Sequence, residues 1–219
     1  PFTTPLTCTV PGLTNGVAYT FTVSASNGAY TSDASASSVA VTPKTVPSAP
    51  TLSAATSSTT FPGSATVTVT PPGSNGGDSI ISYTITSSPG GFTCTVLAPN
   101  TNCIVEGLTP GVAYTFTAVA RNSVPGTSAA SVASNSITPV AKPSAPTNVI
   151  AAAGDEEVTV SFTAPSANGS PITSYKVIAL TIDGVPISPE KSCTPAGNAT
   201  SCTITGLDNE RPYTFSVTA

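Results

Sequence analysis

Short stretches in which hydrophobic and polar residues alternate recur along the chain. Residues 64–70 (SATVTVT) and 80–87 (IISYTITS) alternate between apolar and polar side chains. A period of two is typical of a β-strand with one buried face. Clusters of Pro, Gly and Asn separate these stretches, which are rich in Val, Ile, Thr, Tyr and Phe. The pattern therefore predicts an all-β chain.

A ten-residue motif occurs three times at nearly constant intervals. It reads GLTNGVAYTF from residue 12, GLTPGVAYTF from residue 107 and GLDNERPYTF from residue 206, so the intervals are 95 and 99 residues. A second marker, VPSAPT at 46–51, returns as KPSAPT at 142–147. A period of this length is the size of one β-sandwich domain and is too long for a solenoid repeat.

Two proline-rich stretches set the predicted domain boundaries. Residues 41–50 and 137–146 each carry three prolines, which cannot donate to a sheet ladder and which stiffen a linker. We therefore predict three parts. They are the C-terminal part of a domain at 1–43, a complete domain at 47–139, and a domain lacking its last strand at 143–219.

Seven strands are predicted in the complete domain, with turn signals between them. Residues 91–98 and 102–108 flank the turn APNT and are expected to form a hairpin-like pair. The predicted strands are 51–56, 64–70, 80–87, 91–98, 102–108, 112–120 and 130–139. Seven short strands in about 95 residues are typical of a two-sheet sandwich.

The repeated motif resembles the fibronectin type III family over the whole chain. The resemblance rests on Leu108, Pro110 and Tyr114, on the strand after them, on the proline-rich junctions and on the Asn-Gly loop before Ile-Ser-Tyr. Within this family, the chain is most similar to the tandem repeats of bacterial secreted proteins. It implies tandem seven-stranded, immunoglobulin-like sandwiches, in which Tyr19, Tyr114 and Tyr213 form tyrosine corners.

The sequence departs from the family at two points. The tryptophan that the family carries on its second strand is replaced by Val69 and Phe162, so we expect a smaller core in the complete domain. An Arg-Gly-Asp motif does not occur, which removes the best-known adhesive signal of the family.

Four of the five cysteines form two pairs at the same offset. Cys94 precedes Cys103, and Cys193 precedes Cys202, by nine residues in each case. The alternatives are buried free thiols and disulfides. Zinc is disfavoured because two thiolates and no histidine do not complete four ligands. The repeated pairing favours disulfides and an extracellular location.

Cys8 occupies the position of Cys103 in the first copy of the motif, and its expected partner falls before residue 1. We therefore expect Cys8 to be unpaired by truncation and the natural protein to be longer. A second hypothesis is that neighbouring molecules complete the partial domains by strand addition. The expected partners are thus neighbouring domains of a longer chain or other copies of itself.

The composition and charge of the chain disfavour several classes of function. The six Lys and Arg residues are scattered and the net charge is −4, which disfavours nucleic-acid binding. No stretch reaches 18 consecutive apolar residues, so no membrane insertion is expected within this segment. The chain has no histidine, and its acidic cluster at 154–157 is expected in a turn. We therefore predict no enzyme activity, no catalytic residue, no cofactor and no metal.

The sequence raises two hypotheses about carbohydrate, namely glycosylation of the chain and binding of a glycan. Asn168 and Asn198 stand in glycosylation sequons, which occur often by chance in a chain rich in Ser and Thr. Glycan or cell-surface contact needs exposed aromatic side chains, and Phe2, Tyr30 and Phe61 are the candidates outside the expected core.

These observations favour a structural or spacer segment of a secreted or cell-surface repeat protein. Assembly into an extracellular filament or surface layer is compatible with a charged fraction of only 7%. The alternatives are an accessory array of an extracellular polysaccharide-degrading enzyme, or an adhesin stalk.

Overall fold

The chain folds into β-sandwiches, as the alternating pattern predicts. The computed structural model describes residues 7–58 and 60–219, and these contain twelve strands and no helix. The strands of the first sandwich are β1 (Thr51–Ser57), β2 (Ala65–Thr70), β3 (Ser82–Ser88), β4 (Thr93–Leu97), β5 (Asn102–Val105) and β6 (Thr115–Arg121). Those of the second are β7 (Thr147–Ala153), β8 (Glu157–Thr163), β9 (Lys176–Ile182), β10 (Val185–Cys193), β11 (Ser201–Thr205) and β12 (Tyr213–Thr218).

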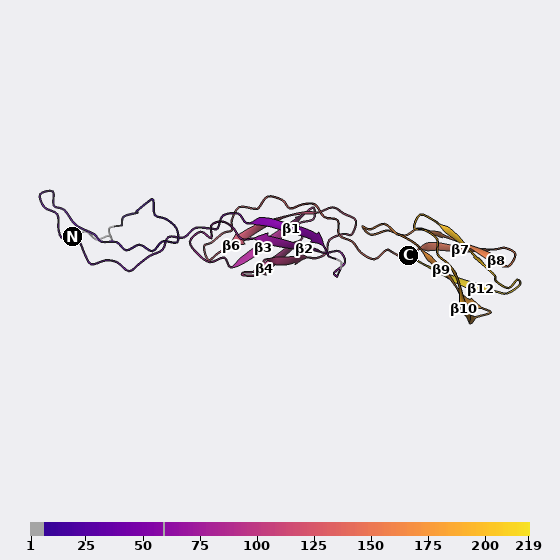
Figure 1. The fold of residues 1–219 in the computed structure, drawn as a ribbon. Coiled ribbons are helices and arrows are strands. Elements are labelled where there is room, and N and C mark those ends of the chain that lie inside the picture. Colours follow the sequence, from indigo (N-terminus) through magenta and orange to yellow (C-terminus); the bar gives the residue numbers. More distant parts are fainter. Residues whose placement is uncertain (1–6, 59) are drawn as a thin grey trace. The chain divides into compact units, whose positions relative to one another are not determined.

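Each sandwich consists of two three-stranded sheets. The first has the orders β1-β2-β5 and β4-β3-β6, and the second has β11-β8-β7 and β10-β9-β12. The strands of each sandwich are drawn in purple to magenta for the first and in orange to yellow for the second (Figure 1). The same topology therefore occurs twice, as the repeated motif predicts.

Burial follows the period of two. In β2, Ala65, Val67 and Val69 are buried while the threonines between them are partly exposed. Val69 and Phe162, the residues at the expected tryptophan positions, are both buried. Phe162 packs against Tyr175 with ring centroids 4.7 Å apart. Aromatic packing thus fills the second core, whereas a valine stands at the equivalent place in the first.

The segment predicted as a seventh strand, 130–139, is not one. Ser128, Ser131 and Ser134 instead hold their segment against β6 through a serine ladder. Each serine N–H donates to a β6 carbonyl, and each serine Oγ accepts the N–H of the same β6 residue. The pairs are Ser128 with Ala120, Ser131 with Ala118, and Ser134 with Phe116, at 2.8–3.0 Å.

The spacing of the serine ladder explains why a regular strand does not form. Three residues of the segment pass two residues of β6, which span about 6.7 Å in a strand. The segment therefore rises by about 2.2 Å per residue, well short of the 3.3 Å of an extended strand. Its own carbonyls drop out of register, and the Oγ atoms take their place as acceptors.

Residues 7–43 use the same device. Ser32, Ser35 and Ser38 pair with Ala25, Val23 and Phe21 in the same reciprocal way, at 2.8–3.1 Å. Outside these bonds the segment has isolated bridges between Tyr19 and Val41 and between Ser26 and Thr31. A hairpin therefore forms here without a regular strand among the described residues.

The expected hairpin-like pair around APNT is also different in the structure. β4 and β5 lie in opposite sheets, so no ladder joins them. Disulfides cross between the sheets: Cys94 is bonded to Cys103, and Cys193 to Cys202, with Cα–Cα distances of 6.2 and 6.3 Å. Each disulfide therefore links the two sheets of its sandwich.

Contacts group the described residues into two compact units. The first comprises residues up to 56 with 66–106 and 114–136, and the second comprises 57–65, 107–113 and 137–219. In the second unit, Gly63 N–H donates to Val140 O at 3.3 Å. Loops of the first sandwich thus bind the segment that leads to β7.

Removing one disulfide should destabilise the first sandwich measurably. Cys94→Ala/Cys103→Ala opens a loop closed by residues nine apart in sequence, and loop entropy predicts a loss of about 2–3 kcal/mol. Urea unfolding followed by NMR of Phe116 is the measurement. Reduction of the parent chain should give a similar loss, and an unchanged midpoint would contradict the role assigned to the bridge.

Candidate functional site

Three backbone hydrogen bonds hold the first junction, which we define as residues 43–48. One bond comes from the turn of the repeated motif in the hairpin, and two connect the junction to the loop between β2 and β3. The bonds are Gly16 N–H to Pro43 O at 2.9 Å, Thr45 N–H to Gly76 O at 2.8 Å, and Ser48 N–H to Ser74 O at 3.0 Å. This linker is therefore hydrogen-bonded on both sides.

The second junction, residues 139–144, repeats the same three bonds. They are Gly111 N–H to Pro139 O at 3.0 Å, Ala141 N–H to Asn168 O at 2.9 Å, and Ser144 N–H to Ser166 O at 3.1 Å. The partners occupy equivalent places in the repeat, namely the motif turn, the linker and the loop before the third strand. The arrangement thus belongs to the repeat and is not an accident of one linker.

A glycine faces a glycine at each junction. Gly77 and Gly169 have φ values of +84° and +92°, which favour glycine. A Cβ on Gly77 would collide with the backbone N of Gly16, and one on Gly169 would lie 2.5 Å from the Pro139 carbonyl oxygen and 3.1 Å from the N of Gly111. Two backbones therefore meet where no side chain fits.

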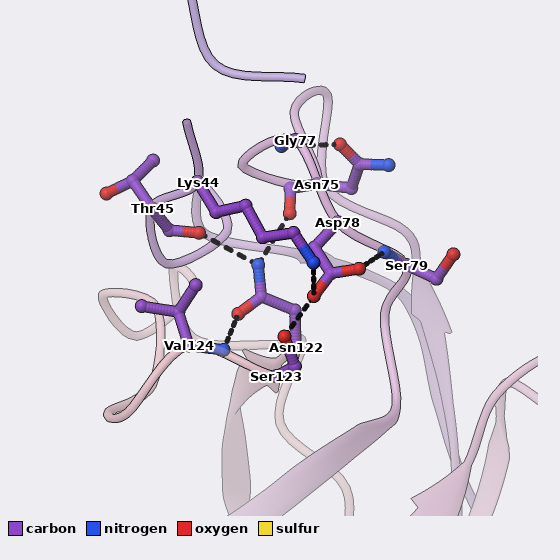
Figure 2. A network of polar contacts seen from close by, with 9 residues as sticks. All are labelled: Lys44, Thr45, Asn75, Gly77, Asp78, Ser79, Asn122, Ser123 and Val124. Carbon is purple, nitrogen blue, oxygen red and sulfur yellow. Dashed lines mark hydrogen bonds and ion pairs between the residues drawn. The ribbon is translucent and has the colours of Figure 1, made fainter. Parts of the chain in front are cut away.

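Asn122 reinforces the first junction from inside. Its side chain is fully buried and donates to the carbonyl oxygens of Thr45 and Asn75, both at 2.8 Å. Its Oδ1 accepts the N–H of Val124 at 3.0 Å. Figure 2 shows this amide lying between the linker and the loop. One side chain thus joins three segments that are distant in sequence.

Asp78 forms the charged edge of the same network (Figure 2). Its carboxylate accepts a hydrogen bond from the Ser123 hydroxyl and lies 3.0 Å from Lys44 Nζ. The N–H of Ser79 also donates to it at 3.0 Å. The bond from Ser123, with the Lys44 ammonium second, lowers the pKa of Asp78 from 3.8 to about 2.

The second junction uses an asparagine of its own. Asn168 Nδ2 donates to the Lys142 carbonyl at 2.7 Å, and Asn168 Oδ1 accepts from the Ser166 hydroxyl at 2.7 Å. The nitrogen that a glycan would need is therefore engaged in the junction. Asn198, the other predicted sequon, is exposed, and its glycosylation stays a prediction.

The predicted tyrosines lie at the turns of the repeated motif. The hydroxyl of Tyr19 accepts the N–H of Thr14 at 3.0 Å, and that of Tyr213 accepts the N–H of Asp208 at 2.8 Å. Tyr114 is buried and meets Phe92 edge-on, with ring centroids 6.3 Å apart. These residues brace the turns from which the junction glycines Gly16 and Gly111 project.

The remaining candidate residues are separate from the junctions. Cys8 carries a free thiol and is exposed. Tyr30 and Phe61 are exposed by 80% and 51% of their surfaces, and they lie in different loops, whereas Phe2 lies outside the described residues. Contact of these aromatic residues with a glycan or a cell surface stays a prediction.

Within residues 7–58 and 60–219, no three His, Cys, Asp or Glu side chains are grouped so as to hold a metal ion. Over the same residues, no helix has the length and apolar character of a membrane span. Ion pairs such as Lys176–Glu190, at 2.9 Å, are solvent-exposed.

Sequence reasoning missed Asn122 and the serine ladders. Asn27 holds the position of Asn122 in the first repeat, and the serines at 32, 35 and 38 recur at 128, 131 and 134. The serines are offset by 96 residues, as the proline-rich marker is, and Asn122 by 95, as the first two copies of the motif are, so a search for repeated polar positions would have found them. Apolar periodicity alone gives no signal at these polar positions.

The comparison with family models agrees with this architecture. The model of the family described as "Fibronectin type III domain" matches residues 48–135 and 144–219. Among solved structures, the crystal structure of chicken CNTN1 FN1-FN3 domains matches with a TM-score of 0.39 and 17% identity, over 94% of this chain and 71% of that one. In the comparison with curated proteins, no match was found.

The asparagine clamp should be needed for stability of the first junction. Asn122→Ala leaves two carbonyls and the Val124 N–H without their partner, and such a loss costs about 1–3 kcal/mol. Thermal unfolding and amide exchange at Val124 are the measurements. Exposed Asn100→Ala is the matched control, and equal effects of the two variants would contradict the clamp.

The Asp78 network should weaken in acid. Because its folded-state pKa is depressed to about 2, its stabilising contribution is complete above the unfolded-state pKa near 4 and is lost as the pH falls through about 2. Carboxyl ¹³C NMR titration measures this. Ser123→Ala should raise the pKa of Asp78, while exposed Ser136→Ala should not. A pKa unmoved by Ser123→Ala would rule out the proposed cause.

Proposed function

The chain belongs to the fibronectin type III family, and we propose on that basis that it is a structural spacer within a larger secreted or cell-surface protein. The observation that carries the proposal is the repeated junction. Two linkers make the same backbone hydrogen bonds and the same glycine-to-glycine approach to the sandwich that follows. Family members are generally modules without catalytic chemistry of their own.

The junctions would do the mechanical work of a spacer. A linker whose N–H groups are bonded to the next sandwich does not swing freely, since bending it breaks those bonds. Proline at several linker positions fixes φ and reduces the chain entropy that ordering must overcome. Each junction therefore transmits a position from one domain to the next.

Export fits the chemistry of the chain. Two disulfides join the sheets of the sandwiches, and disulfides persist in oxidising compartments. The resemblance to bacterial secreted repeats supports the same location. The low charge favours packing of copies in a filament or surface layer, because few ions lose water on contact.

The spacer proposal is tested by Gly77→Ala with Gly91→Ala as its matched control. Both glycines have positive φ, and alanine there costs about 1–2 kcal/mol, but a Cβ on Gly91 meets nothing within 4 Å. Gly77→Ala should therefore separate the hairpin from the first sandwich, while Gly91→Ala should only add strain.

The measurement is ¹⁵N relaxation of residues in the hairpin and in the first sandwich. In the parent chain and in Gly91→Ala the two should share one rotational correlation time, and in Gly77→Ala the hairpin should tumble faster. Independent tumbling already in the parent chain would refute the spacer proposal, because the junction would then transmit no position.

A further inference from the structure

We propose that a cavity of the second sandwich, beside Lys191, binds a uronic acid residue of an acidic polysaccharide through its carboxylate. The cavity has a volume of about 340 Å³, within the range of small-molecule sites. Residues of β9, β10 and β12 and of the motif turn at 206–211 line it, among them Ile182, Ile187, Lys191, Leu207 and Tyr213.

A hairpin that is longer than its counterpart in the first sandwich forms one wall of the cavity. Residues 89–92 join β3 directly to β4, whereas β9 and β10 run on to a turn at 183–184. Between Pro186 and Lys191 the register with β9 shifts, so residues 187–190 bulge from the ladder. Bulges redirect side chains next to functional sites, and an extension carried by one repeat often belongs to a binding face.

Lys191 stands where the first sandwich has an aromatic residue. Phe92 and Lys191 each precede the first cysteine of their pair by two residues, and each pairs with the strand before it. Phe92 meets the motif tyrosine Tyr114 edge-on, with ring centroids 6.3 Å apart. The first sandwich thus packs a ring against its motif tyrosine, whereas the second carries a cation beside a cavity that Tyr213 lines.

The Lys191 ammonium group has no counter-ion in the second sandwich. The side chain is partly buried, and its Nζ would be 3.2 Å from a Cβ on Gly206. Within the part of the chain that the structure describes, no carboxylate forms an ion pair with Lys191. A cation that has lost part of its water favours an anion as its partner, so this site favours an anionic ligand.

The surrounding charges favour an anion with a single charge. The other cation of the cavity, Arg211, donates from Nε to Asp183 at 2.8 Å and lies 3.6 Å from Asp208. These two carboxylates balance the guanidinium charge and would repel a dianion such as phosphate. A carboxylate brings one negative charge and accepts a charge-assisted hydrogen bond from an ammonium group.

The walls of the cavity suit a sugar ring behind that carboxylate. Ile187, Leu207 and the ring of Tyr213 provide apolar surface, and the Asp208 carboxylate can accept hydrogen bonds from hydroxyl groups. The Tyr213 hydroxyl accepts the N–H of Asp208 at 2.8 Å, which fixes the ring. A pyranose has an apolar C–H face and a rim of hydroxyls, so a uronate matches the apolar wall, the acceptor and the ammonium together.

The first test is titration of the ¹⁵N-labelled chain with D-glucuronate at pH 7, followed at the amides of Lys191, Leu207 and Asp208. These amides should shift and saturate, and D-glucose and acetate should each bind at least about tenfold more weakly. Equal binding of glucose would overturn the role of the carboxylate, and equal binding of acetate would overturn the sugar. No shift with glucuronate at millimolar concentrations would overturn the site.

The second test changes the ammonium group. Lys191→Gln should raise the dissociation constant for glucuronate by about tenfold or more. The matched control is Lys176→Gln, an exposed lysine of the same hairpin that pairs with Glu190 and lies outside the cavity, and it should leave binding unchanged. Equal affinities of these two variants would overturn the assignment to Lys191.

A third variant, Lys191→Phe, keeps the proposal testable if glutamine disturbs the hairpin. Phenylalanine stands at this place in the first sandwich, so the variant should keep its fold and lose glucuronate binding. Undiminished binding by a folded Lys191→Phe chain would contradict the proposal. None of these residues belongs to a junction, so the uronate site and the spacer proposal fail separately.

Discussion

Backbone hydrogen bonding at the ends of the sandwiches is the constraint on which the rest of the structure depends. A linker between two domains carries N–H and C=O groups that need partners wherever water is excluded. Here the partners are the loop before the third strand on one side and the turn of the repeated motif on the other. The glycines allow this contact, because only a backbone without Cβ comes close enough.

The same constraint, together with the low charge, explains the serine ladders. A chain with few charged groups has to satisfy its polar backbone through neutral ones, and serine provides a donor and an acceptor within a short side chain. At each of the two edges, three serine hydroxyl oxygens therefore accept the backbone N–H groups that the carbonyls of a regular strand would accept. Asn122 does the same at the first junction, where one amide bonds to three backbone groups.

The repeat, the alternating strands and the cysteine pairs could be predicted from the sequence because each is a regular spacing of residues along the chain. Alternation along 64–70 predicts β2 almost to the residue, and the tyrosine of the motif predicts a braced turn at Tyr19 and Tyr213. Apolar periodicity carries no information about the segment 128–134, whose contacts repeat every three residues through hydroxyl groups. The pairing of β4 with β3 instead of β5 is set by the sandwich and not by the short turn between them.

The junctions could not be predicted in the same way, since their contacts join residues from three separate places in the chain. Gly16, Pro43 and Gly77 each have an ordinary local explanation as turn or linker residues. Only their meeting in space gives them a common role. The proline-rich marker indicates a linker but does not show that it is hydrogen-bonded.

The central claim is that both linkers are held by backbone bonds in solution, and amide hydrogen exchange in the unmodified chain tests it most directly. Thr45, Ser48, Ala141 and Ser144 should exchange at least about a hundredfold more slowly than unstructured amides, as strand amides do. Exchange of all four at the rate of an exposed loop would contradict the account.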